Sequence, residues 1–207
     1  MDPKALAVPI LAGLGALGLF GLPLAVSVGS RHEEDALLKA LPKSKHSLAE
    51  GIQQVSKAPE VAISAKFEME EEDGEKGEKD EKEEEEGELS LSVYTVEKGV
   101  GVDAEHNVLK EFAGSPEAAQ WKPEVEVFKD AAHIARASAQ LTLMALSPFS
   151  LVDIVRKAEK DQPGTVYSVT PVLRDRKPAF EVLVAAQGKT VELRYDLMKG
   201  DLVKPAK

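Results

Sequence analysis

The side chains that most often perform catalysis or bind transition metals are sparse in this sequence and stand far apart. Its four histidines are His32, His46, His106 and His133, and none has another histidine three or four residues away, the spacing that places two zinc ligands on one helix face. The chain has no cysteine and no G-x-S-x-G sequence, so the usual nucleophiles are missing. We therefore expect a non-enzymatic protein without catalytic residues, metal ligands or a cofactor, and interpret His133 as a surface or interface histidine.

One glycine pattern matches the fingerprint of dinucleotide-binding folds. Residues 13–18 read G-L-G-A-L-G, and such glycines allow a tight turn and close approach of backbone amides to a pyrophosphate. The sequence that follows, L-F-G-L-P-L, cannot form the polar-faced helix whose N-terminus would hold the phosphates. We interpret the glycines as part of an apolar leader.

The strongest charge feature is the acidic run at residues 68–88, which holds fourteen acidic residues and three lysines. Its net charge of −11 accounts for the formal charge of −10 of the whole chain, so the remainder is nearly neutral. Such a run predicts a solvated, disordered loop, because its like charges repel and it has little apolar surface to bury. Weak, nonspecific cation binding is the alternative. A nucleic-acid partner is disfavoured because a basic patch is missing.

The first thirty residues form a separate segment. Residues 5–28 carry no charged or strongly polar side chain except Ser27, and Ala25-Val26-Ser27 follows Pro23 as a signal peptidase site would. We expect residues 1–30 to be a signal peptide. An uncleaved membrane anchor through residues 5–28 is the alternative, since the apolar run is longer than the roughly 7–15 residues of a signal core. Both interpretations place the body of the protein outside the cytoplasm.

After a polar connector at residues 31–45, residues 45–113 predict a first small unit. Ser47 and Glu50 form the two ends of a capping box for a short amphipathic helix over 47–55. Alternating apolar residues predict strands over 61–69 and 89–95, joined as a hairpin with the acidic run at its tip. A third strand is expected over 100–103, followed by a turn at 104–107.

Residues 114–147 predict a linker and a helix, after which residues 148–207 repeat the first unit. Ser150 and Asp153 match Ser47 and Glu50 at the start of a helix over 150–158. Strands are expected over 164–173, 179–186 and 190–195, with a glycine-bearing hairpin loop at 187–189. The first unit is longer than the second, as an acidic insertion in its hairpin would make it.

The second unit resembles the PepSY domain family. The similar segments are the helix sequence I-V-R-K-A-E at 154–159, G-T-V-Y-S-V at 164–169, F-E-V-L-V at 180–184 and the closing Y-D-L-M-K-G-D-L at 195–202. Lys199 stands where the family usually has threonine. The first unit is similar but more diverged, and Asn107 stands at its closing turn where glycine is usual.

The resemblance implies an α+β fold with two PepSY-like units, each a helix packed on a three- to four-stranded antiparallel sheet, after an N-terminal apolar helix. It also implies a non-enzymatic module of the periplasm or cell surface, secreted or membrane-anchored, that binds or regulates an unknown peptide or protein, including a peptidase. The alternative is a structural or assembly component of the cell envelope. We expect a partner to engage the surfaces or edges of the sheets.

Deleting residues 70–86 tests the interpretation of the acidic run. Because a solvated loop contributes little packing, we expect the melting temperature in a thermal denaturation scan to change by less than about 3 °C. A larger fall would show that these residues pack against the body of the protein.

Overall fold

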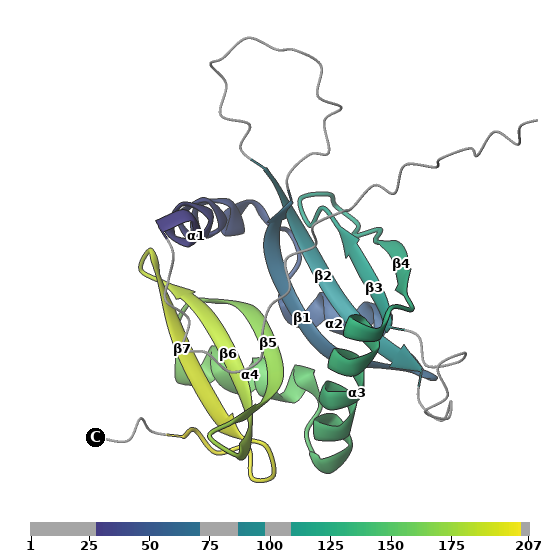
Figure 1. The fold of residues 1–207 in the computed structure, drawn as a ribbon. Coiled ribbons are helices and arrows are strands. Elements are labelled where there is room, and N and C mark those ends of the chain that lie inside the picture. Colours follow the sequence, from purple (N-terminus) through teal and green to yellow (C-terminus); the bar gives the residue numbers. More distant parts are fainter. Residues whose placement is uncertain (1–27, 71–86, 98–108, 204–207) are drawn as a thin grey trace, which may run out of the picture.

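The structure of the protein is a computed structural model, which describes residues 28–70, 87–97 and 109–203. Within these ranges four α-helices and one short 3₁₀ helix pack against a seven-stranded antiparallel sheet. The strand order is β4-β3-β2-β1-β5-β6-β7 (Figure 1). Helices combined with antiparallel strands are what the expected α+β class requires. The leader up to residue 27 lies outside the described residues.

The first half of the chain contributes four of the seven strands. Its elements are α1 (Val28–Ala40), η1 (Leu41–Lys43), α2 (Leu48–Val55), β1 (Glu60–Glu70), β2 (Glu88–Glu97), β3 (Leu109–Gly114) and β4 (Glu124–Phe128). β1 and β2 pair from Glu60 opposite Glu97 to Glu70 opposite Glu88, which confirms the predicted hairpin.

The second half contributes two helices and the remaining three strands. They are α3 (Ala131–Leu146), α4 (Leu151–Asp161), β5 (Thr165–Arg174), β6 (Lys177–Ala186) and β7 (Lys189–Asp196). Gln187 and Gly188 join β6 to β7 with φ angles of 53° and 72°, so both adopt the left-handed conformation that a two-residue hairpin turn needs. All three strands and the helix over 150–158 were predicted.

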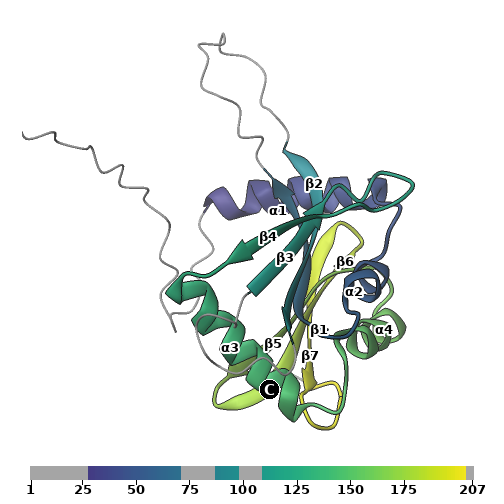
Figure 2. The same cartoon turned by 90° about the vertical axis from the view of Figure 1, so that its right-hand side faces the viewer.

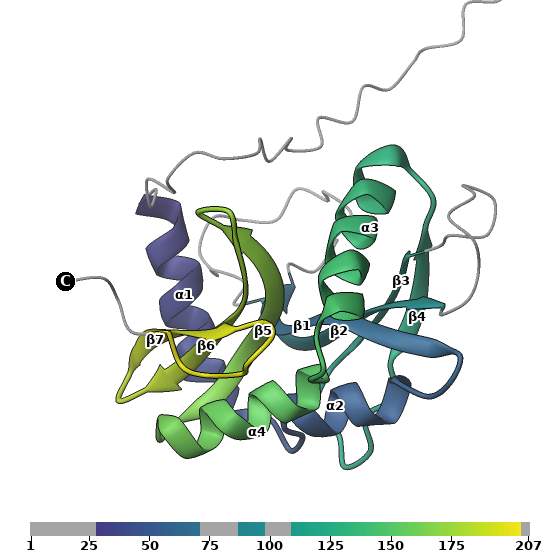
Figure 3. The same cartoon turned by 90° about the horizontal axis from the view of Figure 1, so that it is seen from below.

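The two halves join through their first strands into one continuous sheet. β1 and β5 lie side by side in the middle, with Ala65 opposite Val169 and Lys66 opposite Ser168. α2 and α4, which precede these strands, pack against each other on one face of the sheet, here called the α2/α4 face (Figure 2). α3 lies on the opposite face, here called the α3 face (Figure 3). α1 lies across one end of the sheet (Figure 2).

The two halves share two local features: a capping box at the start of α2 and α4, and a register shift near the start of β1 and β5. The hydroxyl of Ser47 accepts from the Glu50 N–H at 3.2 Å while the Glu50 carboxylate accepts from the Ser47 N–H at 2.7 Å, and Ser150 and Asp153 repeat this capping box. These hydrogen bonds lower the pKa of Glu50 and of Asp153, because they stabilise the charged carboxylates. β1 and β5 each carry a register shift a few residues after their start.

The main core lies between the α2/α4 face and its two helices. Ile52 on α2, Ile154 on α4, and Val93 and Phe180 on the sheet are at most 1% exposed. A smaller cluster on the α3 face contains residues of β1, β2, β3 and α3: Ile63, Tyr94, Val96, Leu109 and Ala137. β1 and β2 are therefore buried on both faces.

The turn after β7 explains why Asp196 and Gly200 occur in the closing segment at residues 195–202. Asp196 Oδ1 accepts from the backbone N–H of Met198 at 3.0 Å and of Lys199 at 2.8 Å, which forms a side-chain-closed turn. Gly200 follows with φ 66°, where a Cβ would lie 2.8 Å from the Phe149 ring. Lys157 Nζ donates to the Gly200 carbonyl at 2.7 Å, so the turn is tied to α4.

Three expectations from the sequence need correction. The polar connector over 31–45 is largely helical, as α1 and η1, because Leu37, Leu38, Ala40 and Leu41 pack against the main core. The segment 114–147 is more than a linker and a helix, since it contains strand β4. Both ends of the acidic run belong to strands, because β1 continues to Glu70 and β2 begins at Glu88.

Most of the acidic loop, the predicted strand at 100–103 and the turn at 104–107 lie outside the described residues. The third strand observed in the first half is β3, which was not predicted from the sequence.

Ile154→Asp tests the contact between α4 and the sheet. Because Ile154 is fully buried, the carboxylate would be placed in the core, and we expect unfolding to become easier by about 4 kcal/mol or more. Chemical denaturation followed by circular dichroism measures this change. Glu159→Asp, on the exposed side of the same helix, is the matched control and should stay within about 0.5 kcal/mol of the parent protein. Equal stability of the two variants would contradict the packing.

Candidate functional site

The sheet ends in two edge strands, β4 and β7, and their outer edges differ. β7 is partly covered by the segment that follows it, because Val203 N–H donates to the Arg194 carbonyl at 2.7 Å and Leu202 forms a bridge with Tyr195. For β4, among the described residues, no backbone hydrogen bond is found beyond its ladder with β3. β4 therefore presents an open edge.

β4 has the sequence Glu124-Val125-Glu126-Val127-Phe128, and its side chains alternate between the two faces. Phe128 lies opposite Leu109, which packs in the cluster on the α3 face, so Glu124 and Glu126 also point to that face. Val125 and Val127 point to the α2/α4 face and are 52% and 46% exposed. The edge thus carries an acidic row and an apolar row on opposite faces.

The connection between β3 and β4 is anchored on the α2/α4 face of the sheet. Trp121 is only 3% exposed, and its indole N–H donates to the Gly114 carbonyl at 3.1 Å. Gln54 on α2 donates to the Trp121 carbonyl at 2.8 Å, and His46 Nε2 lies 3.0 Å from the Ala118 carbonyl. These contacts fix the position of the β3–β4 connection relative to α2.

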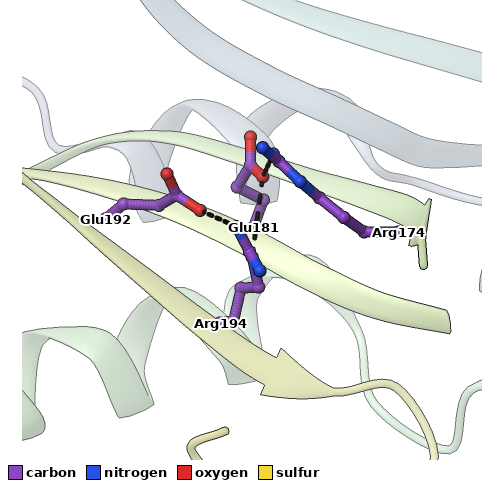
Figure 4. A network of polar contacts seen from close by, with 4 residues as sticks. All are labelled: Arg174, Glu181, Glu192 and Arg194. Atoms are coloured by element: carbon purple, nitrogen blue, oxygen red, sulfur yellow. Dashed lines mark hydrogen bonds and ion pairs between the residues drawn. The ribbon is translucent and has the colours of Figure 1, made fainter. Parts of the chain in front are cut away.

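The α3 face of the second half carries a chain of alternating charges on β5, β6 and β7 (Figure 4). Glu181 accepts from Arg174 Nη1 at 2.7 Å and lies 3.9 Å from Arg194 Nε, while Arg194 Nη2 donates to Glu192 at 2.5 Å. Two positive and two negative groups balance each other here. This part of the face has no excess charge to select a partner.

Tyr94 stands between charged groups on the α3 face of the first half. The guanidinium of Arg136 lies 4.6 Å from the Tyr94 ring centroid and Lys66 Nζ lies 5.9 Å from it. Burial raises the pKa of the Tyr94 hydroxyl, and the neighbouring carboxylate of Glu111 raises it further. Tyr94 is therefore neutral at physiological pH and is a structural residue of this face.

A groove of about 300 Å³ lies between α1 and the turn joining β6 to β7. Its lining consists of Glu34, Asp35, Leu38, Gly188, Lys189 and Thr190. Thr190 Oγ1 lies 2.8 Å from the Tyr167 hydroxyl, so this wall is held by a side-chain hydrogen bond. The groove mixes charges of both signs with one apolar side chain, and it defines no ligand chemistry.

The three histidines in the described residues lie at separate places in the fold. His32 lies exposed on α1, His46 contacts the β3–β4 connection, and His133 stacks on Phe128 at 4.3 Å and pairs with Asp130 at 2.5 Å. His106 lies outside the described residues, as does most of the acidic run. In the described part of the chain, no group of three or more histidine, aspartate or glutamate side chains is arranged to hold a metal ion.

Among the described residues, no single helix is long and apolar enough to cross a bilayer. α3 and α4 reach that length and hydropathy only together, with a bend of 75° between them.

Comparison with known proteins leaves the family open. No family model matches the chain, and no curated protein matches it. A solved structure of a Clostridium difficile 630 protein described as a putative lipoprotein is similar at 12% identity and a TM-score of 0.38, over 78% of this chain and 92% of that one.

Trp121→Ala tests whether the connection holds the edge strand in place. Removing this buried indole should cost about 3–5 kcal/mol and release β4 first, because the β3–β4 connection loses its anchor. Hydrogen exchange should then show faster exchange at residues 109–128 than at β5 to β7. Val125→Ala, at an exposed position of β4, is the matched control and should leave exchange at the connection unchanged. Uniform loss of protection over both halves would contradict a local role for Trp121.

Proposed function

We propose that the protein is a non-enzymatic, extracytoplasmic binding or regulatory protein built from two PepSY-like units, and that a peptidase is among the partners it modulates. The observation that carries this proposal is the recurrence of one structural order in both halves: a capped helix, a strand with an early register shift, and two further antiparallel strands. The recurrence agrees with the segments in which the sequence resembles the PepSY family.

The arrangement of the halves favours binding over catalysis. The α2/α4 face is occupied by its own helices and forms the main core. Among the described residues, accessible parts of the sheet include the edge of β4, with its half-exposed Val125 and Val127. An accessible sheet edge positioned by a rigid core is the kind of surface that receives an extended peptide or a loop of another protein.

The expected location rests on the apolar segment at residues 5–28. Whether it is a signal peptide or an anchor, the segment would direct the body of the protein to the periplasm or cell surface. The same segment favours the alternative function, a structural or assembly component of the cell envelope held at the membrane.

A defined binding assay separates the two functions. Full-length protein would be tested against a panel of exported peptidases and against an array of peptides of known sequence. We expect saturable inhibition of at least one peptidase, or retention of particular peptides, at one partner per chain. Glu33→Lys, at an exposed position of α1, is the control and should leave the interaction unchanged. Absence of both inhibition and retention, with the protein recovered in the envelope fraction, would favour the assembly role.

A further inference from the structure

The open edge of β4 has unused backbone hydrogen-bonding groups. In an antiparallel ladder, every second residue directs its N–H and C=O to the neighbouring strand and the others direct theirs outward. β4 pairs with β3 from Glu124 opposite Ala113 to Phe128 opposite Leu109, and in the described ranges no strand lies on its other side. A further strand can therefore extend the sheet here.

The charges on this edge are of one sign. Glu126 lies directly opposite Glu111, an arrangement of like charges that destabilises a pair of strands. None of the ion pairs among the described residues includes Glu111, Glu124 or Glu126. The neighbouring Lys110 is bound to Glu60 on the other face of the sheet. A positive side chain on an added strand would relieve this repulsion.

The other face of β4 favours apolar contacts. Val125 and Val127 are about half exposed, two residues apart, and beside the partly buried Phe112, which lies opposite Val125. An added strand would cover these valines with side chains of its own. Alternation of apolar and charged residues on β4 thus calls for the same alternation in its partner.

A second copy of this chain does not meet these requirements. Two β4 strands paired antiparallel with matching faces would bring glutamates of the two copies opposite each other when the pairing is centred on Glu126, where all five residues pair, and when it is centred on Val125. The glutamates thus protect the edge against self-association and leave it open to a partner of opposite charge.

From these observations we propose, building on the binding function above, that β4 is the docking edge for an extended segment in which basic and apolar residues alternate. Its two basic side chains would lie on the α3 face beside Glu124 and Glu126, and its apolar side chains would cover Val125 and Val127. The exposed Lys122 and Lys129 flank β4 and limit the basic part to the centre. The matching segment is therefore short, about five residues with two of them basic.

The direct test is hydrogen exchange of the full-length protein with the peptide acetyl-Val-Lys-Val-Lys-Val-amide. We expect saturable binding, with slower exchange at residues 124–128 and unchanged exchange at β7. Affinity should fall when salt is raised from about 50 mM to about 500 mM, because the charges are exposed. Protection confined to β7 or to the groove beside α1, or no change at β4 at saturation, would overturn the proposal.

Matched peptides separate strand addition from simple charge attraction. Acetyl-Lys-Lys-Val-Val-Val-amide has the same composition without the alternation, and the N-methylated Val-Lys-Val-Lys-Val peptide has the same charge without backbone donors. Each should bind about tenfold more weakly or worse, because the ladder and the facing side chains are lost. Equal binding of all three peptides would show nonspecific attraction and would overturn the proposal.

Charge reversal on the protein completes the test. Glu124→Lys with Glu126→Lys should abolish binding of the basic peptide and favour acetyl-Val-Glu-Val-Glu-Val-amide. Glu33→Lys with Glu159→Lys changes the net charge equally at exposed positions elsewhere and should leave the preference unchanged. If the β4 variant still inhibits or retains the partners found in the peptidase and peptide panels, the docking edge is wrong while the binding function stands.

Discussion

The pairing of β1 with β5 under α2 and α4 is the constraint on which the remaining architecture depends. The strands share only a short register around Ala65 and Val169, but the two helices cover this seam together. Side chains such as Ile52 and Ile154 are buried there, and each contributes about 1.5–3 kcal/mol relative to an exposed position. Aromatic residues make up only 5% of the chain, and five of them, Phe67, Trp121, Tyr167, Phe180 and Tyr195, are buried in this one shared core.

Merging the halves determines which surfaces remain accessible. The first strand of each half becomes an interior strand, so among the described strands each half keeps one outer edge. In the second half, residues 201–203 cover part of that edge. In the first half, the chain adds β4 and then turns into α3, and the new edge is fixed through Trp121 and Gln54. The asymmetry between two otherwise similar halves thus arises at their edges, where binding is proposed.

The candidate docking edge could not be predicted from the sequence, for a physical reason. Val125 and Val127 alternate with glutamates, the pattern of a strand, but the run is short and neither side is buried. β3 gives a weak signal because Leu109 and Phe112 are packed on opposite faces of the sheet, so its apolar residues do not alternate. β4 depends on β3 for its ladder hydrogen bonds, while β3 also pairs with β2, and neither pattern predicts the pair by itself.

Local sequence was sufficient where the signal lies within one element. The capping residues Ser47 and Ser150, the period of the helices that follow them and the alternation in β1, β2 and β5 to β7 determined those elements, because caps and amphipathic faces act over a few residues. Only the tertiary structure decided that β1 and β5 pair, that residues 31–43 are helical and that β4 forms an open edge. These features depend on contacts between segments far apart in the chain, whose free energy no local pattern contains.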